Sequence, residues 1–373
     1  MTDLAINTAD LPRRPISAGA EAFAGFTVET DSFAPAEWDR MLADFEDVNL
    51  FQTAVFADGF RGASKMSHLV LRQGGEPVAG ARVAIMKPPG LPSGVAYVKH
   101  GPFWRRSGRP ADSRIYNAVV AAVIKEYGGR RGHLVTISPR PHPQFLPVEK
   151  GALEQAGFHA RMRGRPITFF LVNTGLSEEA LRKSLSQSWR HNLKLAERNE
   201  LQIEFHKPLE ALPDFLALHE AMIARKQFAD REPLHLLPQL FKQLPASSCH
   251  IVTASHRDAV AAAAVIIIAG DVAYYLYGAS ADAALDLRAG YALHWRIARW
   301  LAEHGIAWYD LGDGFGHLRQ FKQGFAGKSG AVIAASELDF GVTWQARLVG
   351  SGVYAARDAL INLRFWRRRI GLG

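Results

Sequence analysis

Residues 309–330, YDLGDGFGHLRQFKQGFAGKSG, gather acidic, basic and imidazole side chains in a glycine-rich stretch. Acid–base catalysis near neutral pH is the usual work of a histidine, which makes His317 a candidate. Lys322 carries an ammonium group that can hold a developing oxyanion or a phosphate, and Asp310 and Asp313 supply carboxylates. The stretch therefore predicts the edge of an active site with these four residues as catalytic candidates. The alternative is that the aspartates cap turns beside glycines.

The end of this stretch, GFAGKS, is similar to the phosphate-binding loop G-x-x-x-x-G-K-[ST], but two features exclude it. The position five residues before Gly327 is Lys322 rather than glycine. The residues that follow, GAVIAASELDF, have the pattern of a strand rather than the helix that such a loop requires. No metal-ligand spacing, Ser–His–Asp order or Cys–His constellation stands out, so we expect no metal site.

A second candidate site precedes the predicted helix at 290–303. Arg288 and Gly290 lie in a turn between strand and helix, where backbone N–H groups and the helix dipole attract phosphate. Asp282 and Asp286 lie just before this turn and weaken that interpretation. The alternative is an ordinary turn glycine beside an exposed arginine.

Two helical patterns are rich in basic residues. In 184–201, Trp189 shares an apolar face with neighbouring leucines, and Arg190 and His191 begin the polar side. The pattern 215–228 ends in Arg225 and a lysine. Such charge runs are most often solvated helix faces.

An internal repeat indicates how these candidates are positioned. Residues 68–86 and 250–268 match without a gap at a constant offset, and each has the pattern of a β-hairpin. Both halves of the chain run strand, helices, hairpin, strand, helix, strand. Strand–helix–strand crossovers predict a parallel strand pair, so we expect an α/β (α+β) fold with two mixed sheets flanked by helices. The expected divisions are 1–160, 161–340 and a C-terminal segment, 341–373.

Composition agrees with a globular chain in a reducing compartment. The length of 373 residues suits two domains, and the single cysteine, Cys249, excludes an internal disulfide. The first residues lack the apolar segment of a signal peptide, and the longest apolar run, 259–270, is too short to cross a bilayer. We therefore expect a cytoplasmic protein.

The C-terminal segment is basic. Residues 344–373 contain six arginines and one aspartate, a net charge of +5, interleaved with leucine, phenylalanine and tryptophan. A helix of this kind can lie on an anionic membrane surface, so peripheral contact with the membrane is one interpretation. A solvated helix packed on its domain is the other. Nucleic acid is a third partner by charge, but no nucleic-acid-binding signature accompanies the arginines, and we expect no DNA partner.

Four motifs together resemble those of the FemAB-like transferases, within the GNAT-like N-acyltransferase superfamily. They are SWRHNLKLAERNEL (188–201), AMIARKQF (221–228), LHWRIARWLAEHGIAWYDLG (293–312) and RQFKQGF (319–325). The resemblance implies two tandem GNAT-like domains, with the active site in the second. It also implies that an amine attacks an activated acyl group.

The resemblance also implies roles for single residues. Phe321 and Lys322 match the F-K-x-G-F element near the family's reaction centre, and Arg225 matches a basic position that contacts phosphate. The pyrophosphate signature Q/R-x-x-G-x-G/A falls on Leu287-x-x-Gly290-x-Ala292, where leucine replaces the first polar residue. The full set of binding candidates is Arg288, Gly290, Ala292, Phe321, Arg225, Trp189, Arg190 and His191.

The implied reaction needs a co-substrate but no bound cofactor. We expect acyl-CoA, an acyl carrier protein or aminoacyl-tRNA as the acyl donor, and a membrane-associated amine, such as a lipid amine or long-chain base, as the acceptor. The long charged helical hairpin of many tRNA-dependent members has no counterpart here, which favours a thioester donor. The alternatives are an aminoacyl-tRNA-dependent transferase acting on a peptidoglycan precursor and a non-catalytic envelope-assembly protein.

Overall fold

The computed structural model describes residues 25–62, 65–161, 166–226, 233–314 and 316–369, and the side chains of 361–369 are not among the described parts. The N-terminal residues used for the localisation prediction, 1–24, lie outside these ranges, as do the last four residues of the basic C-terminal segment. The chain forms two compact units, each with its own sheet and core. The first unit comprises Met1–Phe45, Arg61–Arg165 and Ser336–Gly373, and the second comprises Glu46–Phe60 and Pro166–Ala335.

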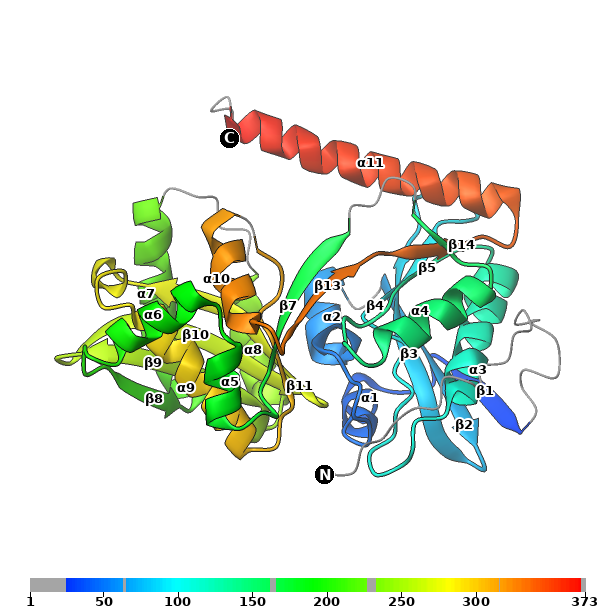
Figure 1. Ribbon diagram of the computed structural model, residues 1–373. Helices are drawn as coiled ribbons and strands as arrows, with labels where there is room; N and C mark the ends of the chain where they lie inside the picture. The colour runs from blue at the N-terminus through cyan, green and yellow to red at the C-terminus, as the bar shows by residue number, and fades with distance from the viewer. Residues whose placement is uncertain (1–24, 63–64, 162–165, 227–232, 315, 370–373) are drawn as a thin grey trace. The chain divides into compact units, whose positions relative to one another are not determined.

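The first unit contains a mixed sheet of seven described strands in the order β1-β2-β3-β4-β5-β14-β6 (Figure 1). The strands are β1 (Phe26–Thr30), β2 (Met66–Gln73), β3 (Glu76–Met86), β4 (Val95–Lys99), β5 (Leu134–Ser138), β6 (His159–Ala160) and β14 (Leu338–Phe340). Its helices are α1 (Pro35–Leu42), α3 (Ser113–Val123) with the π-helical turn η5 (Ile124–Arg130), α4 (Leu146–Gln155) and α11 (Trp344–Arg369).

The second unit repeats this arrangement, with seven described strands in the order β13-β7-β12-β11-β10-β9-β8. The strands are β7 (Ile167–Asn173), β8 (Gln202–His206), β9 (Cys249–His256), β10 (Ala259–Ala269), β11 (Val272–Ser280), β12 (Trp308–Asp310) and β13 (Ala331–Ala335). Its helices are α5 (Glu178–Ser184), α6 (Gln187–Ala196), α7 (Pro208–Lys226), α8 (Leu237–Gln243), α9 (Ala289–Glu303) and α10 (Gly316–Ala326). A further helix, α2 (Ala54–Arg61), begins in this unit.

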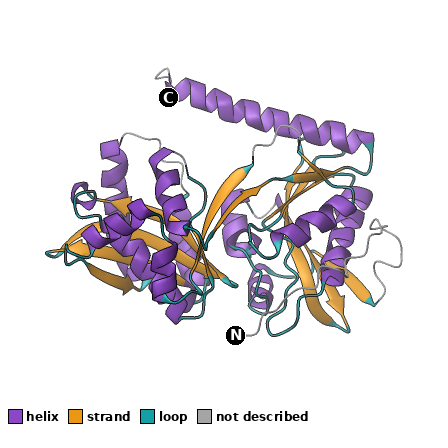
Figure 2. Cartoon of the chain, in the orientation of Figure 1, coloured by secondary structure: helices purple, strands orange, loops and turns teal. Residues whose placement is uncertain are grey.

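The predicted duplication is confirmed strand by strand. The hairpins predicted at 68–86 and 250–268 are the antiparallel pairs β2–β3 and β9–β10. The predicted parallel pairs are β4–β5 and β11–β12, joined through α3 and α9. The expected fold of two mixed sheets flanked by helices is thus the observed one (Figure 2).

The chain passes from one sheet to the other twice, between β6 and β7 and between β13 and β14. β6 belongs to the first sheet but the next strand, β7, belongs to the second, whereas β13 belongs to the second and β14 to the first. Residues 331–340, which the sequence pattern predicts as one strand, are therefore two strands in different sheets, both orange in Figure 1.

The units consequently differ from the sequence-based divisions in three places. Residues 336–340 belong to the first unit because β14 pairs with β5, and α11 belongs there because it packs on the same sheet. Residues 46–60 belong to the second unit because Leu50, Val55 and Phe56 join its core. The division near residue 165 lies close to the expected one.

Each sheet is buried on both faces, which explains why β3 and β10 are almost continuously apolar. In the first unit one face packs on α3 and α4, and the other face meets α11 through Tyr354. In the second unit α5, α6, α9 and α10 cover one face, and α7 and α8 cover the other. The predicted apolar face of the 184–201 segment is confirmed, since Trp189, Leu193 and Ala196 are buried. Cys249 lies in the second core as predicted, and burial raises the pKa of its thiol to about 12.

Candidate active site

The two parallel strands of the second sheet part after three residue pairs. β11 pairs with β12 from Val272 opposite Trp308 to Tyr274 opposite Asp310. The pairing ends there, and the backbone after Asp310 bonds with β7, since Phe170 accepts from the Leu311 N–H and donates to the Gly312 carbonyl. In the first unit, by contrast, β4 and β5 stay paired from Val95 to Lys99, the full length of β4. We call residues 275–280 and 311–314 the strand divergence.

A bulge and a glycine set the position of Tyr275 at the strand divergence. The β10–β11 register shifts between Val265 and Ile266, so Leu276 is an extra residue on β11. Bulges re-aim side chains, and here the Tyr275 hydroxyl lies directly over Gly278. A Cβ at position 278 would come within 1.8 Å of that hydroxyl oxygen, so Gly278 is required for this placement.

Lys322 reaches the strand divergence from α10. Its side chain is buried, and its ammonium group donates a hydrogen bond to the backbone carbonyl of Asp313. The same Nζ lies 5.7 Å from the ring centroid of Tyr275. The ammonium group thus faces β11 just beyond its last pair with β12. A cation at this point can stabilise the negative charge that develops on an acyl carbonyl oxygen.

Aromatic packing holds α10 in place beneath Lys322. The ring of Phe325 stacks on Trp189 of α6 with centroids 4.3 Å apart, and Phe321 lies 5.7 Å from the same indole. Gly324 permits this approach, because a Cβ there would be 2.8 Å from the Ser186 hydroxyl oxygen. The F-K-Q-G-F element thus combines two packing aromatics, one buried cation and one contact glycine.

A neutral histidine–tyrosine pair lies next to Lys322. His294 Nδ1 and the Tyr309 hydroxyl are 2.9 Å apart, and both residues are buried. Burial, with a smaller contribution from the charge of Lys322, lowers the pKa of His294 to about 3. Burial also raises the pKa of Tyr309 well above its usual value. Both side chains are therefore uncharged at neutral pH.

The start of α9 differs from the start of α3 in charge. Arg288 is the N-cap of α9, in the left-handed conformation at φ 53°, and no acidic residue lies in the first turn. Its Nη1 donates to the Leu285 carbonyl at 2.5 Å, and its buried Nε has no partner within the described chain. In the first unit Asp112 caps α3 by accepting from the Arg114 N–H, which places a carboxylate where an anion would bind. Only the α9 terminus of these two crossover helices is suited to a phosphate.

The predicted binding glycine occupies open space. A Cβ at Gly290 would meet no atom within 4 Å, so this part of the first turn is unobstructed. The predicted residues Gly290 and Ala292 are both partly exposed in that turn.

Some of the catalytic candidates converge and others do not. Lys322 and Asp310 are buried at the strand divergence, where Asp310 Oδ1 accepts from the Gly312 N–H at 2.7 Å. Asp313 contributes its carbonyl to Lys322, while its side chain is exposed. His317 is exposed at the beginning of α10. Of the four catalytic candidates, Lys322 and Asp310 are thus buried, and the side chains of Asp313 and His317 are exposed.

The remaining binding candidates on α6 differ in solvent exposure. Trp189 is covered by its neighbours and supports the site from below. Arg190 and His191 are on the exposed side of α6, and Arg190 donates to the Lys183 and Leu185 carbonyls.

Arg225, expected to contact phosphate, is already engaged at the end of α7. It donates to the Ser280 carbonyl at 2.8 Å and lies 3.0 Å from the Asp282 carboxylate. It thereby braces the last residue of β11.

The sequence pattern did not single out Tyr275, His294 or Tyr309. Each carried a usable signal, since the strand run VAYYLY is unusually aromatic and His294 interrupts the apolar face of a helix. A histidine on such a face is most often a satisfied core residue, and only the fold brings it to a lysine.

The GFAGKS segment has a structural explanation that agrees with its exclusion as a phosphate loop. Gly327 ends α10 in the left-handed conformation at φ 64°. A Cβ there would come within 2.4 Å of the Ser184 carbonyl oxygen, so glycine is needed for close packing as well. The segment is a helix C-terminus rather than an N-terminus.

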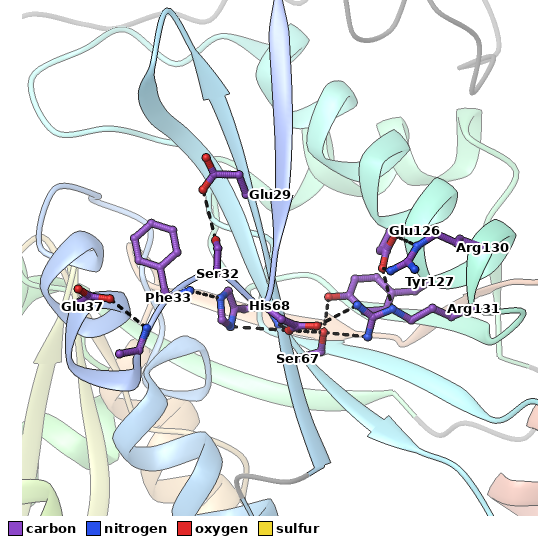
Figure 3. A network of polar contacts seen from close by, with 12 residues as sticks. Glu29, Ser32, Phe33, Glu37, Ser67, His68, Glu126, Tyr127, Arg130 and Arg131 are labelled. Carbon is purple, nitrogen blue, oxygen red and sulfur yellow. Dashed lines mark hydrogen bonds and ion pairs between the residues drawn. The ribbon is translucent and has the colours of Figure 1, made fainter.

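A polar network in the first unit contains Ser67, His68 and Asp31 but is not arranged for nucleophilic catalysis (Figure 3). The Ser67 hydroxyl donates to Asp31 at 2.7 Å, while His68 Nε2 accepts from the Phe33 N–H at 2.9 Å. Burial raises the pKa of Asp31, but hydrogen bonds from the His68 N–H, Ser67 and Arg131 outweigh it and lower the pKa overall. The network joins the end of β1 to β2 and η5.

The described residues contain neither a candidate metal site nor a candidate membrane-spanning helix. No group of three or more histidine, cysteine, aspartate or glutamate side chains there could hold a metal ion. None of the described helices combines the length and apolar composition needed to cross a lipid bilayer.

Part of the second unit matches a known family model. Residues 181–323 match the family model of the acetyltransferase (GNAT) domain. This range contains α6, α9 and Lys322 of α10. A search of curated proteins gives no match to the chain.

Solved structures share most of the fold at low sequence identity. FemX has a TM-score of 0.65 at 16% identity, covering 84% of this chain and 97% of its own. The C-terminal domain of a putative lysylphosphatidylglycerol synthetase from Agrobacterium fabrum has a TM-score of 0.55 at 14% identity, covering 85% and 95%. L-PGS from Bacillus licheniformis has a TM-score of 0.55 at 13% identity, covering 85% and 97%. The chain therefore has a tandem GNAT-like fold.

Proposed function

We propose that this protein is an N-acyltransferase whose second unit binds an acyl-CoA donor at the strand divergence. The acyl group is transferred to the amine of a membrane-associated acceptor, such as a lipid amine or long-chain base. The observation that carries the proposal is the asymmetry between the two units. β11 parts from β12 beside a cationic helix start, whereas β4 stays paired with β5 beside an acidic one.

The donor is held by two features that one chain segment supplies. The β11–β12 pairing ends at Tyr274, and the extended segment 275–280 beyond it is where a pantetheine arm can lie alongside β11. The pyrophosphate then lies at the start of α9, beside Arg288 and Gly290. Asp282 pairs with Arg225, which reduces the repulsion that this carboxylate would exert on phosphate.

The reaction requires positioning, charge stabilisation and one proton transfer. The neutral amine attacks the thioester carbonyl carbon, a C–N bond forms, and the carbonyl oxygen becomes an oxyanion. Lys322 stabilises that oxyanion. Collapse breaks the C–S bond and releases the thiolate of CoA, while the Asp310 carboxylate accepts the proton lost by the amine nitrogen.

The neutral pair His294–Tyr309 supports this chemistry without taking a proton. An imidazolium next to Lys322 would repel the ammonium from the reaction centre. Burial keeps the imidazole neutral, so Lys322 is the cation that faces Tyr275.

An aminoacyl-tRNA-dependent transferase is the second candidate, favoured by the fold likeness to FemX. The putative lysylphosphatidylglycerol synthetase domain covers a similar share of this chain at a TM-score of 0.55, against 0.65 for FemX, and carries a lipid in its name, which supports a lipid acceptor for this chain. A non-catalytic envelope-assembly protein is the third. It gains support from the leucine at the first position of the pyrophosphate signature.

Thiol release tests the proposal. Purified protein is given acyl-CoAs of increasing chain length with a panel of lipid and soluble amines, and free CoA is measured. We expect release that depends on the amine and survives ribonuclease. Ribonuclease-sensitive transfer would favour the tRNA-dependent candidate, and absence of both release and micromolar CoA binding would favour the non-catalytic one.

A further inference from the structure

We propose that α11 is a docking surface for an anionic phospholipid bilayer. Membrane binding by this helix needs neither donor nor turnover. Only its consequence, that the acceptor amine is presented in the membrane, rests on the proposed function.

One side of α11 is fixed to the first sheet. Tyr354 donates a hydrogen bond to Thr136 of β5 at 2.8 Å, and the ring lies 4.1 Å from the Arg161 guanidinium carbon. Gly350 permits the contact, since a Cβ there would be 2.5 Å from Leu134 side-chain atoms. The helix is therefore held in one orientation rather than hanging free.

Another side of α11 exposes large apolar side chains. Trp344 is 69% exposed and Leu348, one turn later, is 65% exposed. At 3.6 residues per turn, this pair lies about 120° around the helix from Gly350 and Tyr354. Val342, just before the helix, is 48% exposed as well.

The helix also continues past its support. Leu360 is two turns beyond Val353, on the side that packs against the sheet, yet it is 57% exposed. The backbone remains helical to Arg369 and appears as one continuous helix in Figure 1. At about 1.5 Å per residue, the part beyond Tyr354 extends over 20 Å.

The charge of this helix selects the kind of partner. Residues 344–373 carry a net charge of +5, and four of the six arginines, Arg364, Arg367, Arg368 and Arg369, follow Leu360. Basic residues near an anionic leaflet add attraction, while tryptophan and leucine enter the interface between head groups and acyl chains. A nucleic acid would use the arginines but gain little from Trp344 and Leu348. The combination therefore fits an anionic membrane better than RNA.

Vesicle binding by the full-length protein tests the inference. The vesicles contain either phosphatidylcholine alone or phosphatidylcholine with 30% phosphatidylglycerol, and bound protein is measured by flotation. We expect at least tenfold tighter binding to the anionic vesicles, weakened by added salt. Equal binding to both vesicles, or none to either, would overturn the proposal.

Two variants separate the apolar and the basic contributions. Trp344→Ser with Leu348→Ser, and Arg367→Gln with Arg368→Gln and Arg369→Gln, should each weaken binding about tenfold. The control is Lys150→Gln with Lys183→Gln and Lys242→Gln, which removes the same charge from exposed positions elsewhere and should leave binding within twofold. Thermal unfolding of each variant checks that the fold is unchanged.

RNA is included as a competitor. The parent protein could bind tRNA at the same salt concentration and fail to bind vesicles. If tRNA binding were then lost in the triple arginine variant but kept in the Trp344/Leu348 variant, the partner of α11 would be a nucleic acid rather than a membrane. Vesicle binding without thiol release from any acyl-CoA would support α11 as a membrane-binding surface and would count only against the proposed acyltransferase function.

Discussion

Lys322 of α10 lies with its ammonium nitrogen 5.7 Å from the ring centroid of Tyr275, the residue that follows the last β11–β12 pair. Helix α10 thus places the buried ammonium group of Lys322 at the point where β11 and β12 separate. This relationship ties the FKQGF element to the strand divergence, and the predictions below test its parts separately.

Replacing Lys322 should abolish most turnover without unfolding the protein. Lys322→Met keeps most of the side-chain volume but removes the charge that faces the developing oxyanion. We expect kcat to fall by about 100-fold with KM for acyl-CoA little changed, as for other losses of an oxyanion donor. Steady-state thiol release measures both. Lys328→Met, an exposed lysine just after α10, is the control and should retain full activity; full activity of Lys322→Met would show that the catalytic assignment is wrong.

Arg288→Gly should improve stability while weakening donor binding. Arg288 has a φ of 53°, where a non-glycine residue costs about 1 kcal/mol, so glycine relieves backbone strain. Loss of the cation should raise KM for acyl-CoA about tenfold or more.

Arg257→Gly is the matched control for Arg288→Gly, because Arg257 has a φ of 46° in the exposed β9–β10 turn. It should give a similar gain in unfolding free energy with unchanged KM. If both variants leave KM unchanged, Arg288 does not contact the donor.

The pH dependence of stability should change in His294→Gln. The folded-state pKa of His294 is about 3, against about 6.5 in the unfolded chain, so the unfolded state binds the extra proton. Neutral His294 therefore favours folding above pH 6.5, and this stability is lost as pH falls towards 3, by about 2 kcal/mol at pH 5. Denaturant unfolding at pH 7.5 and pH 5 measures the difference. Glutamine does not titrate, so the variant should lose about 2 kcal/mol less on acidification than the parent; an identical loss would contradict a buried neutral imidazole.

Two glycine substitutions should separate packing from binding. Gly324→Ala places a Cβ 2.8 Å from the Ser186 hydroxyl and 3.3 Å from Trp189, so we expect a loss of about 1–3 kcal/mol in unfolding free energy. Gly290→Ala meets no atom within 4 Å and should leave stability within about 1 kcal/mol, while obstructing a phosphate at the start of α9. Chemical denaturation and acyl-CoA titration of both variants test this. Equal destabilisation by the two would mean that the α6–α10 contact is not as close as described.

The repeat was predictable because the strand pattern depends on local alternation. The hairpins β2–β3 and β9–β10 carry their apolar residues in the same register, so comparison of two segments of one chain was enough to find them. The sheet that residues 338–340 join was not predictable in the same way. A short apolar strand has the same pattern whichever sheet it joins, and only pairing with β5 assigns Leu338 to the first unit.

The candidate site was partly predictable for a related reason. Lys322 and Arg288 stand out by charge within apolar or glycine-rich surroundings, and the family resemblance added Phe321. His294 and Tyr309 lie on a helix and a strand separated by a turn, and nothing local shows that their polar atoms meet. Burial also decides their protonation, which a sequence does not give.

Amide hydrogen exchange of the full-length protein with saturating coenzyme A tests the central claim most directly. The account predicts slower exchange at residues 275–280 and 288–293, the diverging strand and the start of α9, with no change at residues 95–99 and 113–118 of the first unit. Protection of the first-unit segments, or no protection at the strand divergence, would contradict the assignment of the donor site to the second unit.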